Sequence, residues 1–177
     1  MATASRIENS GELVENKVLV EHLATKDRLI QKGFGELKSR ALVLDLREAL
    51  YLLEKSKLKI KHHGKAVTGR SLRSMAAKKE KNFYKKFVVF SDLWDRGYVV
   101  KTGFKFGFDF RVYPKGKRPG EEHSQWVVEV KTQDEQFKMP ELSRFVRMAQ
   151  TLHTTPLVAI VDSENEINYY QLGRLVP

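Results

Sequence analysis

The stretch from residue 108 to residue 130 constrains the fold most, because it predicts two strands joined by a loop. Apolar and polar side chains alternate from Phe108 to Tyr113, with Phe108, Phe110 and Val112 on one side, which is the period of a half-buried strand. Tyr113 is therefore expected at the strand end, on the polar face. Residues with turn chemistry follow at Pro114, Gly116, Pro119 and Gly120, and these enforce a loop.

The loop delivers His123 just before a second predicted strand, Trp126 to Val130. A phenol and an imidazole that are brought together in this way can transfer protons to and from a bound substrate. The hairpin therefore carries the first candidate site, formed by Tyr113 and His123.

Composition excludes several classes of protein. The chain contains no cysteine, so disulfides, thiolate chemistry and cysteine metal sites are excluded. Its apolar runs are much shorter than the roughly 20 residues that a membrane helix needs. Residues 1–8 have no apolar signal core. We expect a cytoplasmic protein without a membrane partner or a cofactor.

Positive charge is concentrated in the first half. The net charge is +10, and residues 55–86 hold 12 Lys and Arg against one acid, Glu80. Such a block can attract a phosphate backbone, although a solvated helix face would have the same composition. The charge pattern changes near residue 81, so we place two small domains at 1–81 and 82–177.

The first domain is expected to mix strands and helices. Residues 1–16 are interpreted as loosely attached, and strands are predicted at 17–20 and 58–61, with a turn at 62–64. Asp45 and Glu48 have the spacing of a capping box, which starts a helix that ends near Lys55. His62 and His63 would face opposite sides of a regular strand. They are therefore not expected to share a metal ion.

Two helices are predicted between residues 68 and 94, the first from Ser71. The second carries an aromatic stripe at helical spacing, Phe83, Phe87, Phe90 and Trp94. A further helix follows Pro140 and stops at 154–156, and strands are expected at 157–161 and 167–172. The fold class is α+β, with a C-terminal mixed sheet flanked by helices.

A second chemical pattern lies on the same hairpin. Asp109, Glu129 and Lys131 match the D…E-x-K pattern of nucleases in which two carboxylates hold Mg²⁺ and the lysine steadies a hydroxide. Short patterns of this kind arise often by chance. The pattern nevertheless keeps a Mg²⁺-dependent nuclease open as an alternative.

The last hundred residues resemble the archaeal tRNA-intron (splicing) endonuclease family, and the resemblance is looser in the first eighty. It is carried by Asp92-Leu93, Arg96-Gly97-Tyr98, Val100 to Gly103, Lys105 to Gly107, Asp109 to Arg111, Tyr113, Glu122 to Ser124, Phe145 to Arg147, Ala159 to Asp162 and Tyr169-Tyr170. The resemblance implies a restriction-endonuclease-like catalytic domain. It also implies cutting of precursor tRNA at a bulge-helix-bulge, without metal, to a 2′,3′-cyclic phosphate and a 5′-hydroxyl, a lyase reaction.

The resemblance assigns roles to the two residues of the hairpin. Tyr113 matches the general base that takes the 2′-hydroxyl proton, and His123 matches the general acid that protonates the leaving 5′-oxygen. Imidazole suits this task because it titrates near neutral pH. A phenol needs nearby positive charge to act as a base, and Arg111 and Lys115 are close in sequence.

One family position departs from the pattern. The family has a third catalytic residue, a lysine, and its place falls on Thr154 when counted without gaps from His123. A neutral hydroxyl cannot supply the charge that stabilises a pentacovalent phosphate. Lys115 or His153 would substitute, or the chain cuts slowly, or it is a non-catalytic RNA-binding subunit of a mixed tetramer.

The resemblance also implies RNA and subunit contacts. Arg147 matches one of two arginines that sandwich a bulge base, Arg174 is the candidate for the other, and Lys115 is an added RNA contact. Asp134 matches an acidic loop that enters a basic pocket of a neighbouring subunit. With C-terminal strands pairing across a two-fold axis, a homotetramer or a mixed tetramer is expected.

Overall fold

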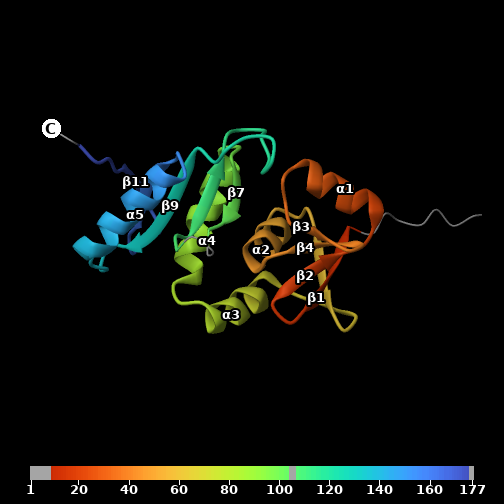
Figure 1. The fold of residues 1–177 in the computed structure, drawn as a ribbon. Helices are drawn as coiled ribbons and strands as arrows, with labels where there is room; N and C mark the ends of the chain where they lie inside the picture. Colours follow the sequence, from red (N-terminus) through yellow and green to blue (C-terminus); the bar gives the residue numbers. More distant parts are fainter. Residues whose placement is uncertain (1–8, 104–106, 176–177) are drawn as a thin grey trace, which may run out of the picture. The chain divides into compact units, whose positions relative to one another are not determined.

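The computed structural model describes residues 9–103 and 107–175, and Figure 1 shows its helices and strands. Its contacts divide the chain into two compact units, Met1–Phe83 (unit 1) and Tyr84–Pro177 (unit 2). Each unit combines one sheet with helices, so the α+β class with two small domains is confirmed. Residues 1–8 and the Lys105-Phe106 part of the family pattern lie outside the described residues.

The sheet of unit 1 has the strand order β3-β4-β2-β1-β5-β6. Its central strand β1 pairs antiparallel with β2 and parallel with β5. Burial alternates along the strands, as in β2, where Val18 and Val20 are fully buried. The strands are Ser10–Val14 (β1), Lys17–Val20 (β2), Glu36–Lys38 (β3), Ala41–Leu44 (β4), Lys59–His62 (β5) and Lys65–Ala66 (β6).

Three helices complete unit 1: Leu23–Gln31 (α1), Leu46–Glu54 (α2) and Gly69–Lys79 (α3). The predicted capping box is confirmed at the start of α2. The Asp45 carboxylate accepts hydrogen bonds from the amides of Arg47 and Glu48, each at 2.8 Å, and Glu48 accepts from the Asp45 amide at 3.1 Å. These bonds satisfy donors that a helix otherwise leaves open.

Three local predictions in unit 1 were wrong. Residues 10–14 are an inner strand and not a loose segment, because they pair on both edges. Helix α3 begins at Gly69 and not at Ser71, because Thr68 is its N-cap. The Ser71 hydroxyl completes the capping box by accepting a hydrogen bond from the Thr68 amide. Strand β5 spans Lys59–His62 and not residues 58–61, so His62 belongs to the strand. His63 has a positive φ of 49°, and the centres of the two imidazole rings lie 4.2 Å apart.

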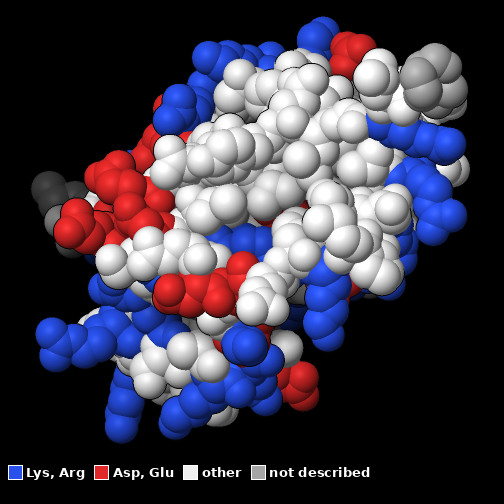
Figure 2. All heavy atoms as spheres, turned by 90° about the vertical axis from the view of Figure 1, so that its left-hand side faces the viewer, with Lys and Arg blue, Asp and Glu red and all other residues white. Residues whose placement is uncertain are grey.

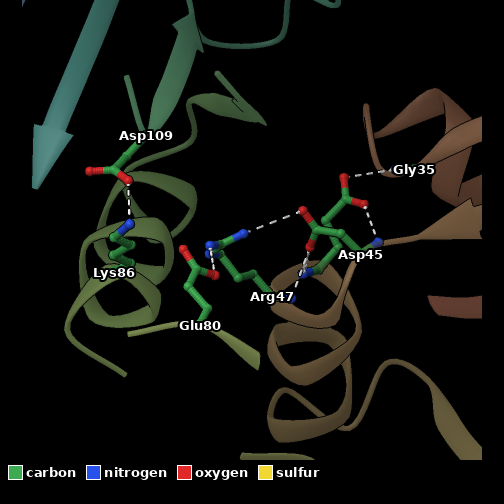
Figure 3. A network of polar contacts seen from close by, with 7 residues as sticks. Gly35, Asp45, Arg47, Glu80, Lys86 and Asp109 are labelled. Atoms are coloured by element: carbon green, nitrogen blue, oxygen red, sulfur yellow. Dashed lines mark hydrogen bonds and ion pairs between the residues drawn. The ribbon is translucent and has the colours of Figure 1, made fainter. Parts of the chain in front are cut away.

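Unit 1 also holds a buried arginine (Figure 3). Arg47 is 4% exposed, forms an ion pair with Glu80 at the end of α3, and lies 5.5 Å from the centre of the Phe83 ring. Glu48 continues the network by accepting from the Gly35 amide at 2.8 Å. This network joins α2, α3 and the turn before β3.

Unit 2 is built on a five-stranded mixed sheet of order β11-β10-β9-β8-β7. β9 and β10 are parallel and the other pairs are antiparallel. The strands are Val99–Thr102 (β7), Phe110–Tyr113 (β8), Trp126–Thr132 (β9), Thr155–Val161 (β10) and Ile167–Gln171 (β11), and the helices are Phe83–Asp95 (α4) and Met139–Thr151 (α5). The predicted mixed sheet with flanking helices is confirmed.

In the core of unit 2, Phe108 and Phe110 do not lie on the same side of the strand, so the expected alternation was wrong at Phe108. Phe110 lies 6.0 Å from the ring of Phe90 on α4. Phe108 instead belongs to the cluster that α5 covers with Phe145 and Ala149. The two phenylalanines diverge because β8 begins only at Phe110, and residues 107–109 bend before it.

Polar bonds tie α4 to the far edge of the sheet. The Tyr169 hydroxyl on β11 donates to Asp92 at 2.7 Å, and Arg96 donates to the same carboxylate oxygen at 2.8 Å. Lys85 donates to the Asp162 carbonyl and to Asn165 in the turn between β10 and β11.

Among the described residues, no helix is both long enough and apolar enough to span a bilayer.

Candidate active site

The loop between β8 and β9, residues 114–125, is held closed at both ends. The Gln125 amide donates to the Val112 carbonyl at 2.8 Å, which continues the pairing of the two strands. Within the loop, the Arg118 guanidinium forms an ion pair with Glu121, which lowers the pKa of that carboxyl. The loop therefore has a defined path that returns the chain to the end of β8.

Tyr113 and His123 line one hollow of about 390 Å³. His123 is exposed, whereas Tyr113 is only 4% exposed. The expected position of Tyr113 on the polar face was therefore only partly correct, because that face is covered by the loop and by the end of α5. The hollow is lined by Arg111, Tyr113, Gly120, Glu121, Glu122, His123, Ser124 and Leu152.

Arg111 enters the same hollow from the same strand face as Tyr113. The two residues are two positions apart on β8, so their side chains leave the strand in the same direction. The sequence had suggested Arg111 only as a positive charge near Tyr113. Its place in the wall of the hollow follows from the pairing of β8 with β7 and β9.

The other proposed cations take different places. Lys115 is exposed, and its ammonium lies 5.3 Å from the centre of the Tyr98 ring, a cation–π contact. Lys115 and His153 are not among the described residues that line the hollow. His153 is exposed just after α5, where its backbone has φ 53°.

Thr154 lies just past the C-terminus of α5, two residues after Leu152, which lines the hollow. Its amide donates to the Ala149 carbonyl at 2.9 Å, and its hydroxyl approaches the same oxygen at 3.4 Å. The next amide, of Thr155, donates to the Gln125 carbonyl at 3.1 Å. Thr154 is thus one residue from a contact with the β8–β9 loop, and its hydroxyl is directed to the end of the helix.

Arg147 and Arg174 line a second hollow of about 660 Å³. Arg147 is an exposed residue of α5, and Arg174 follows β11. Leu142, Val146 and Gly173 complete much of the wall. The structure thus brings the two arginines to one cavity, although the sequence placed Arg174 only by elimination.

Asp134 lies in the loop between β9 and α5 and is exposed. The loop is closed by the Glu135 amide, which donates to the Thr132 carbonyl at 3.0 Å, and by the Glu135 carboxylate, which accepts from the Thr132 amide at 2.9 Å. Asp134 is therefore presented to solvent at the tip of a short, internally bonded turn.

The Asp109, Glu129 and Lys131 pattern lies in a different part of unit 2. Asp109 Oδ1 is 2.6 Å from Lys86 Nζ of α4, as Figure 3 shows, and Oδ2 accepts from the Val130 amide at 2.8 Å. Lys131 Nζ is 3.4 Å from Glu129. Each carboxylate thus has its own lysine partner, and no sequence pattern pointed to Lys86, because it lies on α4.

Burial raises the pKa of Glu129 to about 7, and the nearby Asp109 carboxylate adds to the effect. Lys131 opposes it. Within the described part of the chain, no group of three or more His, Asp or Glu side chains is arranged to hold a metal ion. The donor set around Asp109 is that of buried ion pairs and fits a structural role better than a Mg²⁺ site.

The phenol, the imidazole and the guanidinium line one hollow in a domain with a mixed sheet. The chain is therefore a two-domain α+β protein with a candidate acid–base site on a hairpin loop. Residues 83–169 match the family model of the tRNA intron endonuclease catalytic C-terminal domain, and residues 9–73 match that of the tRNA intron endonuclease N-terminal domain. The chain belongs to the tRNA intron endonuclease family.

Relatives with curated names agree with this assignment. The chain is 38% identical over 142 residues to the tRNA-splicing endonuclease of Thermococcus onnurineus, covering 80% of this chain and 81% of that protein. It is 34% identical over 168 residues to that of Methanothermobacter thermautotrophicus, covering 94% and 98%. With the tRNA-splicing endonuclease of Methanococcoides burtonii it shares 32% identity over 163 residues, which is 46% of that protein.

Proposed function

We propose that the chain is a tRNA-splicing endonuclease that cuts precursor tRNA at intron boundaries by transesterification. The family membership supports the reaction class. The observation that supports the mechanism is that Tyr113 and His123 both line one hollow. One residue is buried and the other is exposed, as expected for a wall and a mouth through which RNA enters.

The chemistry balances with these two groups alone. Tyr113, as phenolate, takes the proton of the 2′-hydroxyl while O2′ forms a bond to phosphorus. The bond from phosphorus to O5′ breaks, and His123, as imidazolium, gives its proton to O5′. The products are a 2′,3′-cyclic phosphate and a 5′-hydroxyl, and no water is consumed.

Substrate recognition is proposed for the second hollow. Arg147 and Arg174 line it together, and planar guanidinium groups stack well on an unpaired base. A bulge is the part of the RNA that offers such a base. Lys115 is proposed to contact the backbone near the cut, because it belongs to the loop that carries His123.

Assembly is proposed to use the β11 edge and Asp134. β11 ends the order of the described sheet, and Tyr170 on it is 52% exposed. Figure 2 shows a broad stretch without charged side chains, bordered by basic and acidic ones, on the face viewed from the side of α5 and β11. An open strand edge suits pairing with a second copy, and Asp134 would enter a basic pocket of another subunit.

The decisive experiment uses a precursor tRNA with a bulge-helix-bulge and a matched substrate with a 2′-deoxy residue at the cut. We expect the purified chain to cut the first in EDTA and to leave a cyclic phosphate, and we expect it to leave the second intact. Cutting of the deoxy substrate that requires Mg²⁺ would instead identify a hydrolytic nuclease that uses Asp109, Glu129 and Lys131. Cutting that begins only when a second protein is added would identify a non-catalytic subunit.

A further inference from the structure

The site proposed above lacks a partner for the charge that develops on phosphorus. When O2′ attacks, negative charge increases on the two nonbridging oxygens, and a fixed cation lowers the energy of that state most. The family pattern places its lysine at Thr154, whose side chain is neutral. The Thr154 hydroxyl also approaches the Ala149 carbonyl at 3.4 Å, at the end of α5.

Arg111 is the one Lys or Arg among the described residues that line the hollow with Tyr113 and His123. Lys115 instead lies 5.3 Å from the centre of the Tyr98 ring. Arg111 also differs from Lys115 in its support, because it lies within β8 and not in a loop. Opposite it lie Lys101 on β7 and Val127 on β9, so its Cα is fixed from both sides.

The chemistry of arginine fits this task. A guanidinium stays charged at any pH at which RNA survives, and its N–H groups form a planar fork that matches two phosphate oxygens. Of the two carboxylates of the hollow, Glu121 is paired with Arg118 and Glu122 is exposed at the loop surface. A guanidinium on a residue within a paired strand is also better preorganised than the ammonium of a lysine at the end of a helix.

We propose that Arg111 is a catalytic residue that binds the nonbridging oxygens of the scissile phosphate and replaces the family lysine. The inference rests on the proposed function and adds a group to the same site. Arg111 exchanges no proton: the 2′-hydroxyl proton goes to Tyr113, and the O5′ proton comes from His123. Its contribution is charge, which is greatest in the pentacovalent state.

The test compares single-turnover cleavage and RNA binding for the wild type, Arg111→Gln and Arg111→Gln combined with Thr154→Lys. We expect Arg111→Gln to slow cleavage about 10²- to 10³-fold, the usual effect of removing one oxyanion partner, with a nearly unchanged Kd. Thr154→Lys should recover at least about tenfold of that loss, because it restores a cation at the family position. The control is Lys138→Gln, which removes one positive charge at the N-terminal end of α5. It should cut at the wild-type rate.

Chemical rescue separates this role from a structural one. Millimolar methylguanidinium should speed cleavage by Arg111→Ala and leave Lys138→Gln unchanged, since the free cation can occupy the vacated space. If Arg111→Gln proves unstable in thermal melts, Arg111→Lys replaces it. We then expect a loss of about tenfold that Thr154→Lys reduces, because the charge stays but the fork is lost.

The outcomes distinguish the two levels of the proposal. Wild-type rates for Arg111→Gln would overturn the role of Arg111 and leave the endonuclease assignment intact. A slowed variant that neither Thr154→Lys nor methylguanidinium improves would also overturn it. A wild-type chain that binds the precursor and never cuts it, with or without a second protein, would refute the proposed function itself.

Discussion

The two units of this chain use charged side chains for different purposes. Residues 1–81 hold 18 Lys and Arg against 10 Asp and Glu, and residues 82–177 hold 14 against 12. The hollow with Tyr113, His123 and Arg111 nevertheless lies in the nearly balanced unit 2. The more basic unit 1 instead has exposed lysines on its β5–β6 hairpin and a buried ion pair at Arg47. Under the proposed function, we therefore expect net charge to mark where RNA is attracted and not where it is cut.

The largest difference between the units should appear when a histidine is removed from each. We expect His123→Ala to lower the single-turnover cleavage rate by about 10²- to 10⁴-fold, because the leaving O5′ loses its acid. His63→Asn in unit 1 should cut normally, since asparagine tolerates the positive φ found there. RNA affinity should be retained in both. Equal cleavage by the two variants would remove His123 from the mechanism.

The second comparison concerns buried ion pairs. Arg47→Met should destabilise unit 1 by about 2–3 kcal/mol. This is less than the loss of a fully buried pair, because the Glu80 side chain that remains is 22% exposed. Chemical denaturation followed by circular dichroism measures the change. Exposed Arg73→Met on α3 serves as the control and should cost less than about 1 kcal/mol. Equal losses would show that the buried network contributes no special stability.

Glu129 predicts a pH dependence that belongs to unit 2. Its pKa is raised to about 7 by burial, so between about pH 4.5 and 7 the folded carboxyl keeps a proton that the unfolded chain has lost. Stability should therefore fall as pH rises through this window and level off above it. Glu129→Gln should flatten this part of the curve and stabilise the protein at pH 8 by up to about 3 kcal/mol. Glu164→Gln, an exposed change in unit 2, should keep the wild-type slope.

The smallest effect is expected from the lysines of unit 1. Lys59→Gln with Lys65→Gln should weaken RNA binding a few-fold, equally for bulged and fully paired RNA, and should reduce the salt dependence of binding. Arg147→Ala in unit 2 should weaken binding of the bulged RNA more, by about 1–3 kcal/mol, because a stacking partner is lost. Filter binding over a salt series checks both. A bulge preference that is lost in the lysine variant would reverse the assignment of the two units.

Local patterns predicted much of each unit. The capping box at Asp45 was read correctly, because its bonds join residues three positions apart. The strand Lys17–Val20 and the continuously apolar β10 were likewise recognised from their own residues. The errors at residues 10–14 and at Phe108 have one cause: pairing with distant strands, and a bend before β8, override the local period.

The sequence by itself determined that a tyrosine and a histidine flank a loop, because proline fixes φ and glycine permits the positive φ that the turns at Gly116 and Gly120 use. It also predicted that Thr154 stands at the family lysine position. Only the tertiary structure decided that Arg111 shares their hollow, that Lys86 neutralises Asp109 and that Glu129 is buried enough to hold its proton near neutral pH. Those properties depend on distances between side chains from different elements and on the exclusion of water, and packing alone establishes both.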